Sequence, residues 1–556
     1  MNLSSQRLCL LTILVCAAGI YIYPLALGTP LTDPDEGLHA SIAQEMVDRG
    51  DYFIPRINGE PFRDKPFLYS AAQAISLRTF GMHEAAVRAP GALFALLTAI
   101  TTVLLARRLF DEETALYAAL ASLTIVMPIV LTQCPAHDVA LVPWINLIVL
   151  SFWEQERATS AKSRWLWVAA MAISIAFAFL TKGLIGVAVV GTGLGLYALV
   201  TRSISPSLVV RMTVALVAGA VLASPWYLAM ESVSPGYLKY YFLERHLLGY
   251  ITEGQEHSDT TWFYYVGPVI GGSMPWFLFA TAAFLQSRLD ACKRSFRPEL
   301  LLACWFVGGF VFLTAAGSRL ITYSLPLFPP IAILGGLCFR RYFHSELANF
   351  PRRMFVGGFS AVAAFGVIAP IPTLYVLSKF LHSPSPWMAY VVAVLASIAM
   401  AFGFALFARG RGQRALATGM LWFPLVTICL MTWPVQKLAN EHSQRSLAAM
   451  VTKLDLAPEE IVLVGQRVGS LRFYLPPDQR AWYSHNRSRE ADPREIPTLL
   501  PPPPGVLFAI TTKELRRQKW EEAMRRLDFR TAGGFEVTQG VPNDLEIASR
   551  SEGGNR

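Results

Sequence analysis

The feature that most restricts the fold of this chain is a succession of apolar stretches, each close to the ~20 residues that a helix needs to cross a bilayer. We count thirteen, at approximately 8–28, 85–106, 113–133, 138–156, 164–181, 184–201, 208–230, 261–284, 299–316, 321–339, 354–378, 385–408 and 413–434. Only 16% of the residues are charged, compared with about 25% in soluble domains. The pattern predicts a polytopic α-helical membrane protein with about 13 transmembrane helices, and the apolar segment 66–81 is interpreted as an interfacial helix.

Basic residues predict the orientation of these spans. The loops on the side of Arg7 carry 19 Lys or Arg residues, whereas the opposite loops carry 10. The positive-inside rule then places the N-terminus in the cytoplasm, and the loops 29–84 and 231–260 and the C-terminal tail outside. Loops that face anionic lipid also account for most of the net charge of +9. The charge therefore indicates membrane lipids as partners, and no nucleic acid.

The composition changes after about residue 436. We interpret residues 1–436 as the membrane domain and 440–556 as a small soluble α/β domain on the outer side. Strands are predicted at 461–465, 471–475, 481–485, 506–512 and 535–539, and a helix at 513–527.

Three carboxylates, those of Asp33, Asp35 and Glu36, follow the first span directly. Either aspartate could cap a helix that starts near Glu36. Apolar residues recur at every fourth position of that helix, opposite polar ones: Leu38, Ile42 and Met46 against Gln44, Glu45 and Asp48. This periodicity predicts an amphipathic helix on the outer membrane surface, although packing against the spans would give the same pattern.

Charge close to hydrocarbon is costly to maintain, so these acids are candidates for chemistry. If Asp35 is partly desolvated, its pKa rises toward the range of a general base, and Glu36 offers a second carboxylate; helix capping is an equally weighted alternative. Lys65 suits a phosphate at the membrane surface, and a salt bridge with its neighbour Asp64 is the alternative.

Further charges lie at the predicted outer ends of spans. Asp138, Lys182 and Arg319 could be ordinary helix-end charges. We favour the interpretation that they converge on a common cavity with Asp35 and Lys65. In the loop 231–260, His246 or His257 could pair with an outer-face acid such as Asp64 to bind a divalent metal, but a hydrogen-bonded or solvated imidazole is more common.

Several motifs occur in a characteristic order along the chain. They are DPDEG at 33–37, GDYFIPRINGEPFRDKP at 50–66, HDVAL at 137–141, TKG at 181–183, SPWY at 224–227 and SRLITYSLPLFPP at 318–330. As an ordered set they resemble the C-type glycosyltransferases. The nearest branch is that of the bacterial lipid A aminoarabinose transferases, close to the protein O-mannosyltransferases.

The resemblance implies an inverting transfer of a sugar from a polyprenyl-phosphate carrier to an acceptor on the periplasmic face of the inner membrane. Asp35 matches the family's catalytic acid position and Asp138 resembles a second one. Lys65 and Tyr323 resemble residues that hold the carrier phosphate, where Lys182 and Arg319 are further candidates. Asp64 and His246 resemble a family metal site, which implies one possible zinc-like divalent ion and no other cofactor.

Three positions depart from the family pattern. Leu38 stands where relatives often have arginine, Gly249 replaces another arginine, and Asp64 replaces a glutamate. The favoured acceptor is a glycolipid of the lipid A type. A protein acceptor with the same donor class stays open, as does a lipid-linked sugar transporter, which would be expected to show repeated halves that this sequence lacks.

Overall fold

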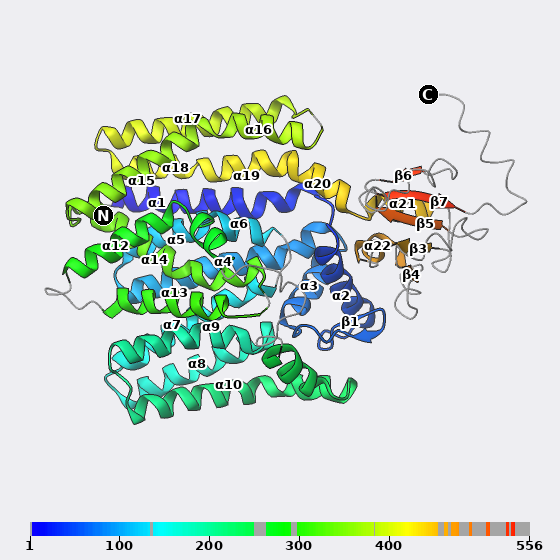
Figure 1. The fold of residues 1–556 in the computed structure, drawn as a ribbon, viewed down its shortest axis with the longest axis horizontal. Helices are drawn as coiled ribbons and strands as arrows, with labels where there is room; N and C mark the ends of the chain where they lie inside the picture. Colours follow the sequence, from blue (N-terminus) through cyan, green and yellow to red (C-terminus); the bar gives the residue numbers. More distant parts are fainter. Residues whose placement is uncertain are drawn as a thin grey trace, which may run out of the picture. The chain divides into compact units, whose positions relative to one another are not determined.

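The structure is a computed structural model of the 556-residue chain, and it is mostly helical (Figure 1). It describes residues 3–133, 137–248, 263–290, 297–317, 319–382, 384–453, 461–464, 469–477, 489–491, 507–511, 530–532 and 535–539. Contacts divide the chain into two compact units. The first comprises Met1–Leu27, Arg63–Ala72 and Arg88–Trp433, and the second comprises Gly28–Phe62, Gln73–Val87 and Pro434–Arg556.

Helices make up nearly all of the first unit. In chain order they are α1 (Leu3–Ala17), η1 (Ala18–Ile22), η2 (Tyr23–Leu27), α4 (Glu84–Leu109), α5 (Glu112–Thr124), α6 (Val126–Thr132), α7 (His137–Arg157), α8 (Ala161–Lys182), α9 (Leu184–Val200), α10 (Pro206–Val233), η3 (Lys239–Leu248), η4 (Gly267–Gly271), α12 (Trp276–Asp290), α13 (Arg297–Thr314), η5 (Ile321–Leu327), α14 (Phe328–Phe343), α15 (Asn349–Ile368), α16 (Pro370–Phe380), α17 (Trp387–Ala408), α18 (Gly412–Met420) and α19 (Trp422–Thr432). The segment predicted as an interfacial helix is α3 (Leu68–Phe80). Its residues are divided between the two units, and the first turn of α4, up to Val87, also belongs to the second unit.

Among the described residues, seven helices are long and apolar enough to cross a membrane. They are Ser4–Leu27, Glu84–Leu109, Ala161–Lys182, Pro206–Val233, Ile321–Phe343, Trp387–Ala408 and Gly412–His442. Two bent pairs, α5–α6 at 54° and α15–α16 at 51°, raise the number to nine. The larger predicted number also counts the shorter apolar helices Leu184–Val200 and Pro298–Thr314, together with α7 and α12. A multi-pass helical membrane protein is thus confirmed, and the number thirteen stays a prediction.

Close helix packing in the first unit depends on glycine. A Cβ on Gly193 of α9 would lie 2.6 Å from the Cα of Trp305 in α13, and one on Gly308 would lie 2.7 Å from the Cα of Gly193. In the same way, a Cβ on Gly336 of α14 would lie 2.6 Å from the backbone nitrogen of Ala118 in α5. Small residues at these crossings let helix backbones approach, as membrane helices do where lipid supplies no hydrophobic drive for association.

The second unit combines three short helices with a small sheet and with the residues that follow the first span. Its elements are α2 (Asp35–Arg49), a hairpin of β1 (Arg56–Ile57) and β2 (Glu60–Pro61), α20 (Pro434–His442), α21 (Arg445–Lys453), α22 (Gly469–Tyr474), β3 (Ile461–Val464), β4 (Arg489–Ala491), β5 (Leu507–Thr511), β6 (Arg530–Ala532) and β7 (Phe535–Gln539). The strand order is β4-β3-β5-β7-β6; β3 runs parallel to β4 and β5, and β7 runs antiparallel to β5 and β6. The hairpin turns at Asn58 and Gly59, which both have positive φ, as a two-residue Asn-Gly turn requires.

Three of the predicted strands are confirmed, because 461–465, 506–512 and 535–539 contain β3, β5 and β7. The strand predicted at 471–475 is wrong, since these residues lie largely in the helix α22. A short apolar run fits a buried helix as well as a strand, and periodicity alone does not separate the two. The strand at 481–485 and the helix at 513–527 lie outside the described residues.

The helix predicted to start near Glu36 is confirmed as α2, but its environment is not the predicted one. Gln44 and Glu45, expected on a solvated polar face, are completely buried. The capping prediction is also wrong. Pro34 occupies the N-cap without a side-chain hydrogen bond, and the Glu36 carboxylate instead accepts hydrogen bonds from the Thr32 backbone N–H at 2.8 Å and hydroxyl at 3.0 Å.

Candidate active site

Asp64 and Lys65 belong to a cluster of ion pairs. Both lie at the start of Arg63–Ala72, the second of the three segments that form the first unit. The Lys65 ammonium lies 3.1 Å from Asp64 Oδ2, and the Arg245 guanidinium lies 2.5 Å from Oδ1. The three side chains keep 25%, 29% and 36% of their surface exposed, for Lys65, Asp64 and Arg245 in turn. Two cations therefore share one carboxylate, and both remain within reach of solvent or of a ligand.

Asp138 and Lys182 form a second, deeper ion pair. Asp138 lies in the first turn of α7 and Lys182 is the last residue of α8, and each side chain is only 8% exposed. The Lys182 ammonium also lies over the ring of Tyr323 in η5, 3.8 Å from its centre, which adds a cation–π contact. The spacing of these residues in the sequence is large, so only the packing of α7 against α8 brings them together.

These two groups belong to one region of the first unit. Asp64 and Lys65 are close enough to Lys182 to interact electrostatically with its ammonium. The Arg319 guanidinium donates a hydrogen bond to the Thr314 carbonyl at 3.1 Å. The charges of Arg319 and Asp138 both interact electrostatically with the Tyr265 hydroxyl. We call Lys65, Lys182, Arg245 and Arg319, with Asp64 and Asp138, the cation cluster. Among the described residues, the cluster so defined contains four cations and two carboxylates, a formal excess of positive charge.

The TKG motif explains how the loop segment η3 approaches this cluster. Gly183 has a φ of +74°, and a Cβ there would lie 2.6 Å from the Tyr241 hydroxyl and 3.0 Å from Nε2 of His246. Only glycine leaves this space free and adopts this backbone conformation without strain. Tyr241 in turn stacks on Tyr237, with ring centres 5.3 Å apart. The break between α8 and α9 thus holds η3 beside Lys182.

The predicted metal site does not fit the residues that are present. Both Asp64 oxygens face cations, and Nδ1 of His246 lies 2.7 Å from the Tyr241 carbonyl, to which it is positioned to donate. Burial lowers the pKa of His246 below the ordinary imidazole value. Within the part of the chain that the structure describes, no group of three His, Cys, Asp or Glu side chains could hold a metal ion. His257 lies outside the described residues. A guanidinium therefore occupies the position beside Asp64 that was assigned to a metal.

Asp35 and Glu36 belong to the second unit, where they open α2. Asp35 is exposed and makes no hydrogen bond or ion pair with any residue that the structure describes. The partial desolvation considered for Asp35 stays a prediction. Glu36 is buried and holds Thr32. The nearby Asp33 accepts a hydrogen bond from the backbone N–H of Ser470 at 2.7 Å, and burial raises the pKa of Asp33 to about 7.

The residues that sequence reasoning did not assign to the site are Arg245 and Tyr241. Arg245 stands directly before His246, and its charge on the predicted outer side was the available signal. Its partner Asp64 is distant in sequence, so the ion pair itself could not be expected. Tyr241 had no signal beyond the aromatic character of its segment.

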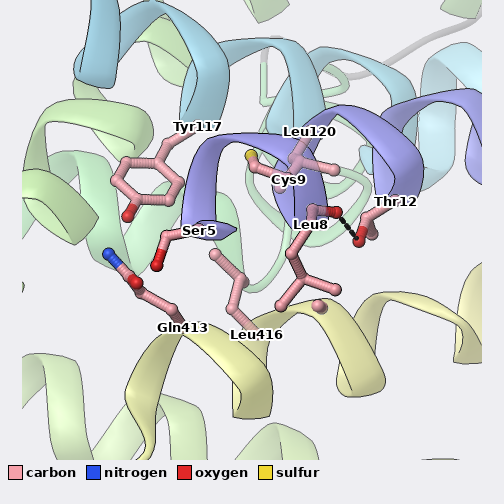
Figure 2. A pocket seen from close by; sticks show the side chains of 9 residues that line it. Ser5, Leu8, Cys9, Thr12, Tyr117, Leu120, Gln413 and Leu416 are labelled. Carbon is pink, nitrogen blue, oxygen red and sulfur yellow. Dashed lines mark hydrogen bonds between the residues drawn. The ribbon is translucent and has the colours of Figure 1, made fainter. Parts of the chain in front are cut away.

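A small cavity elsewhere in the first unit carries none of these residues. Figure 2 shows it between α1, α5 and α18, and its volume is about 10 Å³, roughly the space of one water molecule. Its lining includes Ser5, Cys9, Thr12, Tyr117 and Gln413. The cavity is too small for a sugar and offers no charged group.

Comparisons with known proteins agree with this fold. The family described as dolichyl-phosphate-mannose-protein mannosyltransferase matches residues 64–228. The undecaprenyl phosphate-alpha-4-amino-4-deoxy-L-arabinose arabinosyl transferase 2 of Proteus mirabilis (strain HI4320) is 30% identical over 383 residues, which are 68% of this chain and 67% of the relative. The corresponding transferase of Aeromonas salmonicida (strain A449) is 30% identical over 316 residues, 56% of this chain and 57% of the relative.

A solved structure extends the likeness over nearly the whole chain. The crystal structure of ArnT from Cupriavidus metallidurans bound to undecaprenyl phosphate is similar with a TM-score of 0.74 and 22% identity, and the match covers 95% of this chain and 97% of that one. This similarity shows a shared fold.

Fold and sequence together define a multi-pass membrane glycosyltransferase of the C type, an enzyme that depends on a sugar carried by polyprenyl phosphate. Within that class, the chain belongs to the family of undecaprenyl phosphate–aminoarabinose arabinosyl transferases of the bacterial inner membrane.

Proposed function

We propose that this enzyme transfers 4-amino-4-deoxy-L-arabinose from undecaprenyl phosphate to a glycolipid of the lipid A type, with inversion at the anomeric carbon. The observation that carries the proposal is the 30% identity to the Proteus mirabilis transferase over two thirds of both chains. The cation cluster supplies the chemistry that a lipid-phosphate donor needs. The reaction takes place on the periplasmic face of the inner membrane.

The cation cluster binds the donor phosphate in this proposal. Lys65 and Arg245 are the accessible cations of the cluster, since their side chains retain 25% and 36% exposure. Asp138 already neutralises Lys182, which contributes to the phosphate site from the buried side of the cluster, together with Tyr323 and Arg319. A charge-assisted contact to a phosphate oxygen is worth more than a neutral hydrogen bond. These groups stabilise the negative charge that grows on the departing phosphate.

Asp35 is the general base. The acceptor hydroxyl oxygen attacks the anomeric carbon, the bond from that carbon to the phosphate oxygen breaks, and the phosphate keeps the electron pair. The hydroxyl proton passes to the Asp35 carboxylate, which is exposed at the start of α2. Glu36 and Asp138 support the reaction by holding other groups, Thr32 and Lys182 respectively. No step passes through a metal.

The arrangement in the membrane is part of the same proposal. Thirteen spans carry the chain across the membrane, with the N-terminus in the cytoplasm. Residues 1–436 form the transferase domain, with outer loops 29–84 and 231–260, and residues 440–556 form a periplasmic α/β domain. The excess of basic residues in alternate loops supports this orientation.

Transfer to a protein hydroxyl is the second candidate. The match of residues 64–228 to a family described as protein mannosyltransferases favours it. The donor chemistry would be the same, and only the group that Asp35 deprotonates would differ.

Mass spectrometry of the cell envelope separates the two candidates. Lipid A and envelope glycoproteins are compared between the parent strain, a deletion strain, and the deletion strain that expresses either the native chain or Lys65→Ala. We expect lipid A to lose a 4-amino-4-deoxypentose substituent on deletion, and the native chain but not Lys65→Ala to restore it. Unchanged lipid A with a missing protein glycan would favour the second candidate. Unchanged lipid A and unchanged glycoproteins would contradict both.

A further inference from the structure

The C-terminal part of the chain holds the segment that carries Asp35. Within the second unit, α22 contacts α2 and the residues before it through a series of polar bonds. Ser470 donates to Asp33 through both its backbone N–H and its hydroxyl, Ser41 donates to the Gly469 carbonyl at 2.7 Å, and Gln44 donates to the Phe473 carbonyl at 3.2 Å. Two more bonds, from the Leu31 backbone N–H to the Tyr474 hydroxyl at 2.8 Å and from the Asp33 backbone N–H to the His442 carbonyl at 2.9 Å, extend the series.

Two glycines make this close approach possible. A Cβ on Gly37 of α2 would overlap the backbone nitrogen of Ser470, and a Cβ on Gly469 would overlap the Asp33 carboxylate. Gly469 also has a φ of +42°, in the region that disfavours side chains. The backbones of the two segments therefore meet with no side chain between them, and a small displacement would break several bonds at once.

A buried ion pair fixes the same two helices. Glu45 of α2 and Arg472 of α22 are paired with both side chains at 0% exposure. Glu45 also accepts hydrogen bonds from Arg49 at 2.9 Å and from the Gly59 backbone N–H at 3.0 Å, so it links α2, α22 and the β1–β2 hairpin. Buried pairs add little net stability, but a charge left without its partner is very costly. The pair therefore tolerates one relative position of α2 and α22.

Asp33 is the member of this polar series that lies nearest to Asp35 in the sequence, two residues before it. Asp33 is bonded to Ser470 and His442, whereas the Asp35 side chain extends free of any described partner at the start of the same helix. A carboxylate without partners of its own depends on its backbone for position. A misplacement of about 1 Å is enough to cost two orders of magnitude in rate.

We infer that α22 acts as a positioning element of the transferase: Ser470 and Arg472 set the place of Asp35 through Asp33, Glu45 and α2. Neither residue contacts the reacting atoms. The inference rests on the proposed function, in which Asp35 is the base. It gives the C-terminal domain a role in the rate of sugar transfer.

The test is a double-mutant cycle on purified full-length enzyme, with the undecaprenyl-phosphate-linked sugar and lipid A. We expect Ser470→Ala to lower kcat about tenfold with little change in the donor KM, and Ser470→Thr to restore part of the loss. The same Ser470→Ala change is then made in an Asp35→Asn background. If Ser470 acts through Asp35, it causes no further loss there, because coupled sites are not additive. An equal loss in both backgrounds would overturn the inference.

Arg472 supplies a second arm that allows for misfolding. Arg472→Met removes the buried cation that faces Glu45, so it is compared with the apolar pair Glu45→Met/Arg472→Met, which removes both charges. Limited proteolysis of residues 434–556 confirms that each variant is folded. We expect the folded double variant to keep a normal donor KM and a kcat lowered about tenfold. A folded double variant with native kcat would contradict the role of Arg472.

The controls separate this inference from the proposed function. Arg445→Ala removes an exposed cation of α21 that pairs with Glu84 at 3.4 Å, and we expect native kcat. If Asp35→Asn alone keeps full activity, the general base of the proposed function is wrong. If Asp35→Asn is inactive while the Ser470 and Arg472 variants are native, only the positioning role fails.

Discussion

Two charged groups, one in each unit of this protein, use ion pairs in opposite ways. In the second unit, Glu45 and Asp48 face Arg49 and Arg472, two acids against two cations, and the side chains of the Glu45–Arg472 pair are completely buried. In the first unit, the cation cluster sets four cations against two carboxylates, and Lys65 stays partly exposed. A buried ion pair of opposite charges holds parts of a fold together. An unmatched, accessible set attracts an anion from outside.

The comparison also assigns different tasks to residues that look alike in sequence. Asp33, Asp35, Glu45 and Asp64 are all acids on the predicted outer side. Asp33 and Glu45 are held by the C-terminal segment, Asp64 is held by two cations, and Asp35 alone of the four has no described partner. Asp35, whose carboxylate has no partner among the described residues, is therefore the acid that is available for proton transfer.

The largest effect is expected from breaking the Asp138–Lys182 pair. Lys182→Met leaves Asp138 buried without its cation, and removal of one partner of a buried pair costs about 3–5 kcal/mol. Thermal unfolding in detergent micelles measures this loss. The double variant Asp138→Asn/Lys182→Met should recover much of the stability and remain poor in sugar transfer. Recovery of both stability and transfer would show that the pair is only structural.

Lys65→Ala should weaken donor binding more than folding. The lost charge-assisted contact predicts a donor KM raised about 10–100-fold, whereas a partly exposed ion pair contributes only about 0.2–1 kcal/mol to stability. Steady-state kinetics with varied donor, beside thermal unfolding, provide both values. Arg78→Ala, which removes an exposed cation of α3, serves as the matched control. A native donor KM for Lys65→Ala would remove Lys65 from the phosphate site.

Treatment with a chelator tests whether sugar transfer depends on a metal ion at Asp64. Since Arg245 and Lys65 already satisfy Asp64, we expect excess EDTA to change the transfer rate by less than about twofold. Arg245→Ala frees one Asp64 oxygen and should raise the donor KM. Loss of activity with EDTA that added zinc restores would contradict the assignment of Arg245 to the place of a metal.

The last prediction concerns the pH dependence of stability in the second unit. The pKa of Asp33 is raised from 3.8 to about 7, so between these values the folded protein holds a proton that the unfolded chain has released. Stability should therefore increase as the pH falls from 7 toward 4, and this contribution disappears as the pH rises through about 7. Asp33→Asn should flatten that slope in thermal unfolding at several pH values. An unchanged slope would show that another group titrates.

Much of the fold could be predicted from the sequence because membrane-spanning helices are recognisable by their length and apolar composition. The hairpin turn at Asn58-Gly59 and the break at Gly183 were not predicted, although glycine at both sites is the local signal for a positive φ. The periodicity of Leu38, Ile42 and Met46 predicted a helix, but not what surrounds it, because α22 follows more than four hundred residues later.

The gaps in the prediction have the same physical origin. The sequence LRFYL at 471–475 is compatible with both a strand and a helix. In the structure it is helical, and Arg472 is buried against Glu45, a pairing that the local pattern does not reveal. The metal assignment to Asp64 and His246 stays a prediction, and the sequence could not show that Arg245, remote from Asp64 in sequence, pairs with that carboxylate. Sequence patterns report local preference and burial, whereas pairing across the fold depends on packing that no single segment encodes.

The role of Asp35 is tested most directly by the single-turnover rate of sugar transfer in the Asp35→Asn enzyme, with saturating donor and lipid A in reconstituted vesicles. A general base contributes about 10²–10⁴-fold, so the account predicts a fall of that size, with native donor binding and native thermal unfolding. An Asp35→Asn enzyme that transfers sugar at the native rate would contradict it.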